Sequence, residues 1–364
     1  MKIVFISNYA MGLWKFRKEI VQAFLEKNDE VHIIVPEDEF SENFKRMGCQ
    51  VHPSKLERHG KNPFAELQLL RSYIKQIKAI QPDIVFSYTI KPNLYAGIAT
   101  RLLRVPFVPN ITGLGEVFQK QTMLTILVKN LYKFALKDAK TIFFQNSHNK
   151  SVFLKNRIVK EQQTTLIPGS GVNLSDFEFQ EFPPDSQPIN ILYIGRLSAH
   201  KGIPELCEVA QNFDSDLVNF QIVGFPEDEF IQSFDKMLQI KCFEYFGKQE
   251  DVRSFIKQAH AVIQPSHHEG LSNTLLEAAA MGRPLLASNI PGCKEIIDQD
   301  QNGYLFEVNH AESLKGTIQK FIDQSFETRK LMGENSRHKV NREYDRNIIV
   351  QHYLNLRKRN EDVI

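Results

Sequence analysis

Short apolar segments alternate along this chain with longer segments of helical periodicity, and this alternation is the feature that most restricts its fold. Apolar runs of strand length, each followed by a pattern of helix length, are typical of parallel sheets wrapped by helices. The first half predicts strands at Lys2–Ser7, Val31–Val35, Ile84–Ser87, Phe107–Asn110 and Thr141–Gln145. The second half predicts strands at Ile189–Gly195, Phe220–Val223, Phe243–Phe246, Ala261–Gln264, Pro284–Ala287 and Gly303–Phe306. Each half therefore predicts its own doubly wound, Rossmann-like α/β domain.

The boundary between the two domains is expected between Ile167 and Pro188. At 364 residues the chain exceeds the length over which one hydrophobic core usually keeps growing. Glycines and prolines punctuate the boundary stretch, which has no helical periodicity. We expect an N-terminal domain over 1–167 and a C-terminal domain over 168–341, with a last helix near Arg342–Lys358 bringing residues 342–364 back onto the first domain. Two such domains would face a cleft, and ligands bind beside the carboxyl ends of parallel strands.

The charge of the chain is unevenly distributed, although the total is only +2. Residues 1–165 hold 25 Lys and Arg against 14 Asp and Glu, whereas the remainder holds 20 against 29. The basic half predicts an anionic partner. Within it, Val117–Leu136 interleaves apolar residues with lysines at helical spacing. Such a helix either lies on an anionic membrane surface or packs on the core with a solvated basic face, and periodicity does not separate the two.

Cysteine spacing and hydropathy indicate a cytoplasmic protein. The four cysteines show no C-x-x-C spacing, and the chain begins in a strand pattern instead of a signal peptide. No apolar run approaches the roughly 18 residues that a transmembrane helix needs. The basic half lacks a stacking module or a helix-turn-helix pattern, so nucleic acid is not an expected partner. We expect the protein to be peripheral at the inner face of the cell membrane.

The first chemical motif follows the strand Ile189–Gly195, where Gly195-Arg196-Leu197 precedes Lys201 by four residues. Glycine at a strand end lets a ligand approach the backbone closely. The Arg196 guanidinium can grip two phosphate oxygens, and Lys201 adds a compact charge beside it. Both cations would stabilise negative charge that grows on a departing nucleoside diphosphate.

The second motif runs from His267 to Glu277 and is predicted to open a helix that ends near Met281. Backbone N–H groups at the start of this helix would form a diphosphate site. Glu277 can accept both hydroxyls of a ribose, and Glu269, in the loop, can reach hydroxyls of a transferred sugar. His267 and His268 have no matching carboxylate or cysteine cluster nearby in sequence, so we interpret them as wall residues and expect no metal.

Together these motifs resemble the retaining GT-B glycosyltransferases of family four. The resemblance rests on Gly195-Arg196-Leu197, Lys201 and the Glu269/Glu277 pair. Further matches are Pro168-Gly169-Ser170-Gly171-Val172-Asn173 before Phe177, and Asn289-Ile290-Pro291-Gly292 before Glu295. In the first domain, Lys91-Pro92-Asn93-Leu94-Tyr95 and Thr112-Gly113-Leu114-Gly115 resemble the branch that extends undecaprenyl-diphosphate-linked sugars, as bacterial N-acetylgalactosaminyltransferases do.

The resemblance implies a role for each matching residue. Arg196, Lys201 and Glu269 would be catalytic. The donor, a UDP-sugar, would contact Gly12, Leu13, Gly195, Lys248, Gly270, Leu271, Ser272, Asn273, Thr274 and Glu277. Gly12 and Leu13 would lie in the loop after the first strand. The acceptor, a polyprenyl-diphosphate-linked sugar, would contact Lys91, Asn93, Thr112 and Gly113.

The resemblance also implies retention of configuration without a metal or another cofactor, because the two cations take the place of a metal. Many relatives carry a histidine near the donor sugar, where this chain reads Ser87-Tyr88-Thr89-Ile90-Lys91, so no first-domain histidine is assigned. Two other classes stay open at this level: a sugar-nucleotide epimerase of the same fold, and a non-catalytic subunit that binds lipid-linked sugar. A dinucleotide-dependent oxidoreductase is disfavoured, because no G-x-G-x-x-G follows the first strand.

Overall fold

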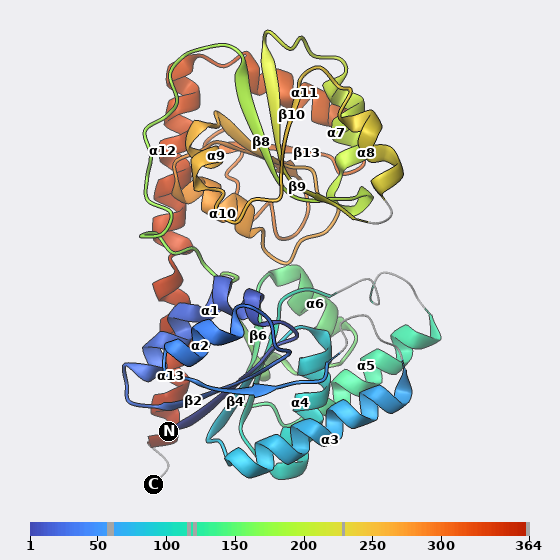
Figure 1. Ribbon diagram of the computed structural model, residues 1–364, viewed down its shortest axis with the longest axis vertical. Coiled ribbons are helices and arrows are strands. Elements are labelled where there is room, and N and C mark those ends of the chain that lie inside the picture. Colours follow the sequence, from blue (N-terminus) through green and yellow to red (C-terminus); the bar gives the residue numbers. More distant parts are fainter. Residues whose placement is uncertain (57–61, 115–117, 119–121, 228–229, 362–364) are drawn as a thin grey trace. The chain divides into compact units, whose positions relative to one another are not determined.

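In the computed structural model the chain forms two compact units (Figure 1). The structure describes residues 1–56, 62–114, 118, 122–227 and 230–361. Unit 1 comprises Met1–Ser170 with Asn347–Ile364, and unit 2 comprises Gly171–Arg346. The sequence placed these two boundaries at 167/168 and 341/342.

Unit 1 is built on a parallel sheet with strand order β3-β2-β1-β4-β5-β6-β7. Its strands are β1 (Lys2–Ile6), β2 (Glu30–Val35), β3 (Gln50–Pro53), β4 (Ile84–Tyr88), β5 (Phe107–Ile111), β6 (Ile142–Phe144) and β7 (Thr164–Leu166). The five predicted strands are all present. β3 and β7 were not predicted, because these edge strands are largely accessible to solvent and carry no continuous apolar run.

Helices cover both faces of the unit 1 sheet. The helices are α1 (Ala10–Leu25), α2 (Ser41–Arg46), α3 (Pro63–Ile80), α4 (Ile90–Leu103), α5 (Met123–Ala135), α6 (Ser147–Lys155) and α13 (Arg346–Glu361), with a 3-10 turn at Glu161–Gln163. One buried apolar cluster joins the sheet to α3, α4, α5 and α6, and a second joins it to α1, α2 and α13. The sheet therefore has a core on each face, as a doubly wound fold requires.

Unit 2 repeats this plan with strand order β10-β9-β8-β11-β12-β13, again all parallel. Its strands are β8 (Ile189–Leu197), β9 (Val218–Pro226), β10 (Phe243–Gly247), β11 (Ala261–Gln264), β12 (Leu285–Ser288) and β13 (Gly303–Phe306). Its helices are α7 (Ile203–Ala210), α8 (Ile231–Met237), α9 (Arg253–Gln258), α10 (Asn273–Ala280), α11 (Ala311–Ile322) and α12 (Phe326–Glu343), with a 3-10 turn at Ala199–Lys201. All six predicted strands are present, and the predicted fold class is confirmed.

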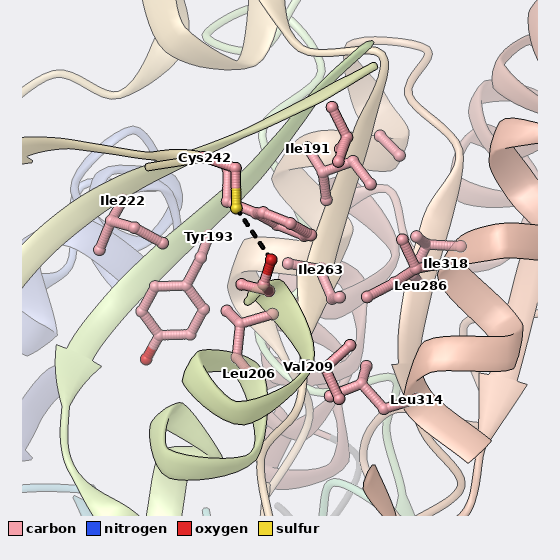
Figure 2. Packing of buried hydrophobic residues seen from close by; sticks show 14 of the residues in the cluster. Ile191, Tyr193, Leu206, Val209, Ile222, Cys242, Ile263, Leu286, Leu314 and Ile318 are labelled. Carbon is pink, nitrogen blue, oxygen red and sulfur yellow. Dashed lines mark hydrogen bonds between the residues drawn. The ribbon is translucent and has the colours of Figure 1, made fainter. Parts of the chain in front are cut away.

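Figure 2 shows the core between the unit 2 sheet and the α7/α8/α11 face. Ile191 and Tyr193 of β8 are fully buried there, and Leu206 and Val209 of α7 pack against them. The Cys242 thiol donates to the backbone carbonyl of Ala210 over 3.1 Å. This packing holds β8 in place, and the first chemical motif lies at the end of that strand.

The last helix, expected over Arg342–Lys358, is α13 (Arg346–Glu361), and it directly follows α12, for which no helix was predicted. α12 ends at Glu343 and belongs to unit 2, whereas α13 begins at Arg346 and packs in unit 1. Between them the backbone leaves the helix, because the Tyr344 carbonyl accepts from the Val172 N–H and the Arg346 N–H donates to the Val172 carbonyl. These bonds use groups that a continuous helix would pair internally.

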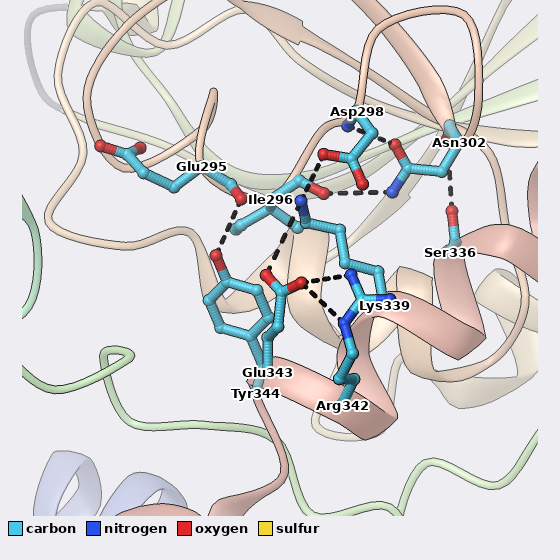
Figure 3. A network of polar contacts seen from close by, with 9 residues as sticks. All are labelled: Glu295, Ile296, Asp298, Asn302, Ser336, Lys339, Arg342, Glu343 and Tyr344. Carbon is cyan, nitrogen blue, oxygen red and sulfur yellow. Dashed lines mark hydrogen bonds and ion pairs between the residues drawn. The ribbon is translucent and has the colours of Figure 1, made fainter.

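Polar contacts fasten the end of α12 to unit 2 (Figure 3). The Lys339 ammonium lies 2.6 Å from the Asp298 carboxylate, and the Tyr344 hydroxyl donates to the Glu295 carbonyl over 2.8 Å. In unit 1, α13 is fastened by Tyr353, whose buried hydroxyl accepts hydrogen bonds from Tyr88 and Asn110. Over the described residues, no helix combines the length and apolar content needed to cross a bilayer.

Two histidines lie side by side at the β2/β3 edge of unit 1. His32 Nδ1 lies 2.9 Å from His52 Nε2, and His32 is almost fully buried. Burial lowers the pKa of both imidazoles, and the neighbouring His52 lowers that of His32 further. The folded state therefore binds fewer protons than the unfolded state once the pH falls below about 6.5.

We expect the stability of unit 1 to be complete above about pH 6.5 and to fall as the pH drops below it, because protons then favour the unfolded state. Replacing both histidines with Gln should flatten that fall. Chemical unfolding of the wild type and the double variant between pH 7.5 and 5 measures how steeply the free energy of unfolding falls with pH. Equal slopes in the two proteins would contradict the assignment.

Candidate functional site

The strand order of unit 2 places the predicted residues at one edge of its sheet. The chain passes from β8 to β9 and β10 on one side, and then to β11, β12 and β13 on the other. The reversal falls between β8 and β11, which are paired neighbours. Ligands of doubly wound folds bind beside the carboxyl ends of the strands at such a reversal. The two chemical motifs follow β8 and β11, so both lie at this point.

The end of β8 is shaped by close backbone contacts. Gly195 pairs in register with Gly224 of β9, and a Cβ on Gly224 would lie 1.7 Å from the Gly195 carbonyl oxygen. The buried Tyr193 hydroxyl donates to the Arg196 carbonyl over 2.7 Å. Burial raises the pKa of Tyr193 well above its ordinary value, so the hydroxyl keeps its proton and remains a donor. These contacts set the direction in which Arg196 leaves the strand.

The Arg196 side chain is about half exposed and forms an ion pair with Glu227. Glu227 directly follows β9, and Arg196 is the last residue but one of β8, which pairs with β9 as far as Leu197 and Pro226. Glu227 was not predicted, although its place just after a strand could have indicated it. A guanidinium has five N–H donors, so one carboxylate partner leaves donors for an anion.

Lys201 is held by the turn that follows β8. Gly202 has φ +70°, and a Cβ there would lie 2.0 Å from the Pro265 carbonyl oxygen, so only glycine fits. The Lys201 ammonium then lies 2.6 Å from Glu269 Oε1, and both side chains are more than four-fifths buried. The two motifs, separated by 68 residues in sequence, are in direct contact.

Glu269 is oriented by a second residue that sequence analysis missed. Gln264, at the end of β11, is 2% exposed and donates through Nε2 to Glu269 Oε1 over 3.2 Å and to the Ser266 hydroxyl over 2.6 Å. Lys201 and Gln264 thus meet the same carboxylate oxygen. No described residue donates a hydrogen bond to Oε2, so this oxygen can accept one from a ligand hydroxyl.

The segment after Glu269 begins α10 as expected. Ser272 caps the helix, because its hydroxyl accepts from the Leu275 N–H over 3.3 Å. The Ser272 N–H donates to the Gly292 carbonyl over 2.8 Å, so this expected phosphate donor is already engaged. Leu271 is buried in the core, and Gly270 and Thr274 are partly buried beside it.

The remaining predicted donor residues lie further along the same edge. Asn273 is the first residue of α10, and Glu277 lies one turn into the helix with its side chain half-buried. Gly270, Asn273 and Glu277 each make a further contact of their own. Lys248 is exposed and directly follows β10, the strand at the edge of the sheet.

In unit 1, Gly12 and Leu13 lie in the first turn of α1 and not in a loop as expected. The helix begins early because Asp38 Oδ2 accepts from the N–H groups of Ala10 and Met11, at 3.0 and 3.1 Å. Leu13 is 2% exposed, and a Cβ on Gly12 would lie 2.4 Å from the Tyr9 ring. The Leu13 side chain therefore belongs to the core, and a contact to a ligand is left to the backbone.

Two expected acceptor residues are engaged within unit 1. Asn93 is 1% exposed, its side-chain carbonyl accepts from the Ser87 hydroxyl over 2.6 Å, and its amide donates to the Asn110 carbonyl over 2.9 Å. Its amide thus joins β4 to β5 and is not available on the surface. Lys91 forms an ion pair with Glu66 of α3 at 2.5 Å. Thr112 and Gly113 directly follow β5 and are partly exposed.

His267 pairs with neighbouring groups. Its Nε2 lies 3.0 Å from Glu205 Oε1, and its backbone N–H donates to the His200 carbonyl. Within the described ranges, His, Cys, Asp and Glu side chains form no group of three that could hold a metal ion.

Two protein-family models match this chain. The model of the glycosyl transferases group 1 matches residues 175–339, and the model of the glycosyl transferase 4-like family matches residues 2–146. The two matches fall within unit 2 and unit 1, respectively.

Three curated relatives are glycosyltransferases by name. The N,N'-diacetylbacillosaminyl-diphospho-undecaprenol alpha-1,3-N-acetylgalactosaminyltransferase of Campylobacter jejuni is 27% identical over 98% of both chains. A UDP-Gal:alpha-D-GlcNAc-diphosphoundecaprenol alpha-1,3-galactosyltransferase of Escherichia coli is 24% identical over 76% of this chain and 75% of its own. The capsular polysaccharide biosynthesis glycosyltransferase CapM of Staphylococcus aureus is 23% identical over 90% of both.

Solved structures share the fold. Anabaena HepE in complex with UDP superposes with a TM-score of 0.81 at 16% identity, covering 98% of this chain and all of that one. Sucrose-phosphate synthase from Thermosynechococcus elongatus gives a TM-score of 0.80 at 16% identity over the full length of both chains.

We expect Gly202→Ala to destabilise unit 2 by at least about 2 kcal/mol, because alanine is disfavoured at this backbone angle and its Cβ would meet the Pro265 carbonyl. Gly316→Ala is the matched control, since Gly316 lies inside α11 with no atom within 4 Å of an added Cβ. That change should stabilise by about 0.5–1 kcal/mol. Denaturant unfolding measures both, and a Gly202→Ala protein as stable as the wild type would contradict the geometry.

Proposed function

Because this chain belongs to the GT-B glycosyltransferases of family four, we propose that it is a retaining hexosyltransferase with a UDP-sugar donor and a polyprenyl-diphosphate-linked saccharide acceptor. The transferred sugar would be a hexose or an N-acetylhexosamine, such as GalNAc, Gal, GlcNAc or Glc. The product would enter capsule, O-antigen, exopolysaccharide or glycan assembly, as the names of the relatives suggest.

The ion pair between Lys201 and Glu269 is the observation that carries the donor assignment. It places a cation and a carboxylate 2.6 Å apart at the strand-order reversal of unit 2, where ligands of this fold class bind. An ammonium has three N–H donors and only one is needed for Glu269. A donor diphosphate would take the remaining donors of Lys201 and those of Arg196, while Glu269 Oε2 accepts from a sugar hydroxyl.

Proposed roles for the other unit 2 residues follow from their places along the same edge. Glu277, one turn into α10, would accept both ribose hydroxyls, and the backbone near Lys248 would meet the uracil. The Gly270–Thr274 segment would lie along the diphosphate. Within this set the Ser272 N–H is already bonded to Gly292, so its contribution would be to position the loop.

The chemical step needs no group beyond these residues and the two substrates. The bond between the anomeric carbon and the diphosphate oxygen breaks while the acceptor hydroxyl oxygen bonds to that carbon from the same face. The departing phosphate oxygen takes the acceptor proton. Configuration is retained because the acceptor oxygen adds to the same face of the anomeric carbon that the diphosphate leaves. Arg196 and Lys201 stabilise the charge that grows on the diphosphate, which is the work that a metal ion does in other enzymes.

The acceptor is assigned to unit 1, whose excess of Lys and Arg suits a lipid diphosphate on an anionic surface. Lys91, Thr112 and Gly113 follow β4 and β5 and are the proposed acceptor contacts. Asn93 is omitted from this set because it is buried. Lys91 would exchange its partner Glu66 for an acceptor phosphate.

α5 is proposed as the helix that meets the membrane. Its inner face, with Tyr132 and Ala135, is buried in the core, whereas Met123, Ile126 and Leu127 are 89%, 62% and 55% exposed. Exposed apolar residues near a helix start, followed by exposed lysines, are typical of a helix that lies in a membrane interface. Part of the expected segment, including Val117 and Lys120, lies outside the described residues.

The donor assignment predicts that UDP and a UDP-sugar raise the melting temperature, whereas GDP and ADP do so less. A ligand at 100 times its dissociation constant stabilises a protein by ~2.7 kcal/mol. Glu277→Ala should weaken the shift with both UDP compounds. Lys201→Ala should lower turnover on the ~10²–10³ scale of one lost charge-stabilising group. No shift with any uridine nucleotide would argue against the donor site.

The membrane assignment predicts that the protein floats with vesicles containing phosphatidylglycerol but not with purely neutral phosphatidylcholine vesicles. Leu127→Gln should weaken flotation, because it removes an apolar side chain from the exposed face of α5. Leu331→Gln in α12 is the matched control, since Leu331 is also 55% exposed but lies in unit 2. Equal flotation of both variants, or indifference to the anionic lipid, would remove the membrane part of the proposal.

A further inference from the structure

Two segments of unit 2 meet beside Glu269. The first is the loop Glu269–Ser272, which follows β11 and leads into α10. The second is the turn over residues 291–296, which follows β12 and contains both Gly292 and Glu295. Neither Gly292 nor Glu295 has a role in the function proposed above. Their contacts show how the loop that carries Glu269 is held.

Gly292 packs directly on the backbone of that loop. Its φ is +90°, and a Cβ there would lie 2.8 Å from the Glu269 carbonyl oxygen and 2.7 Å from that of Gly270. Its own carbonyl accepts from the Ser272 N–H over 2.8 Å, at the residue that caps α10. The position of Gly292 therefore decides where Glu269 and the start of α10 lie.

Glu295 holds Gly292 in turn. Its Oε2 accepts from the Gly292 N–H over 2.7 Å, and its backbone carbonyl accepts from the Tyr344 hydroxyl over 2.8 Å. Figure 3 shows the Glu295 carboxylate directed away from the ion pairs of Lys339 and Glu343. The side chain therefore takes no part in fastening α12 and acts on the Gly292 turn.

The second carboxylate oxygen, Oε1, is buried and has no hydrogen-bond partner among the described residues. A buried carboxylate with one unsatisfied oxygen costs stability, and an uncharged side chain of the same shape would cost less. Holding the Gly292 N–H needs only one acceptor oxygen at this position, which a Gln carbonyl would also supply.

We propose that Glu295 is a positioning residue for the donor site, which it controls by holding the Gly292 turn against the Glu269–Ser272 loop. The effect of Glu295 on donor binding rests on the proposed function, because it requires that Glu269 and α10 bind the donor. The positioning itself can be tested without any ligand.

The test compares Glu295→Ala, Glu295→Gln and Asp298→Asn in the full chain. Glu295→Ala loses the acceptor of the Gly292 N–H, whereas the Gln carbonyl can still accept it. Asp298→Asn is the matched control, because it weakens the ion pair with Lys339 on the same side of unit 2 without touching Gly292. Gly292→Ala is a further variant that should displace the loop through its added Cβ.

The first readout is hydrogen exchange of the peptide that spans residues 266–277, measured without nucleotide. We expect faster exchange in Glu295→Ala and Gly292→Ala, and exchange like the wild type in Glu295→Gln and Asp298→Asn. Wild-type exchange of this peptide in Glu295→Ala, with the variant folded, would overturn the proposal. Equally fast exchange in Glu295→Gln would also overturn it, because the carbonyl should suffice.

The second readout is the affinity for UDP and for UDP-sugars. Glu295→Ala should lose about 10- to 100-fold, on the scale of a small misplacement of binding groups, while Glu295→Gln stays within about threefold. If Glu295→Ala loosens the loop but binds the donor as the wild type does, the proposed link to the donor site fails. If the wild type binds no nucleotide, the proposed function fails, and the exchange result still decides whether Glu295 positions the loop.

Discussion

The ion pair between Lys201 and Glu269 is the interaction on which the unit 2 site depends. It joins the turn after β8 to the loop after β11, so it exists only because these two strands are neighbours in the sheet. The contact also needs a glycine at 202, since a Cβ there would collide with Pro265, and it needs Gln264 to orient the carboxylate. Each of these conditions is a packing constraint, and together they place two opposite charges that are mostly removed from water. In such surroundings a charge interacts more strongly with a ligand than it would on an open surface.

Internal hydrogen bonds settle which unit 1 residues can reach a ligand. Asp38 caps α1, Asn93 joins β4 to β5, and Tyr353 accepts from Tyr88 and Asn110 at the packing surface of α13. All of these groups lie near the carboxyl ends of the strands, where a polar residue can either contact a ligand or hold the fold together. A buried polar residue belongs to the second kind, because a polar group removed from water must be satisfied within the protein. Asn93 is satisfied in this way, whereas Thr112 and Gly113 remain partly exposed.

α5 shows why a sequence pattern can leave two interpretations open. Both a core helix and an interfacial helix require alternating apolar and basic residues. The packed helix has a buried face, with Tyr132 and Ala135, and an opposite face on which Met123 and Ile126 are exposed. A helix whose only task was to pack on the core would not need apolar residues on its outer face. The exposed face is therefore the one that the membrane proposal uses.

The sequence by itself determined the fold class, the eleven predicted strands and the residue types of the two chemical motifs, because strand and helix periodicity and motif spacing are local properties of the chain. It placed Gly12 and Leu13 in a loop, missed β3 and β7, and began the last helix at Arg342, whereas α13 begins at Arg346. Only the tertiary structure decided these points, since Asp38 starts α1 early and Val172 separates α12 from α13 through backbone hydrogen bonds. It also supplied the contacts of Glu227 with Arg196, of Gln264 with Glu269 and of Glu295 with Gly292. The first of these exists because β8 and β9 are neighbours in the sheet, and the other two depend on how the loops after β11 and β12 fold against one another.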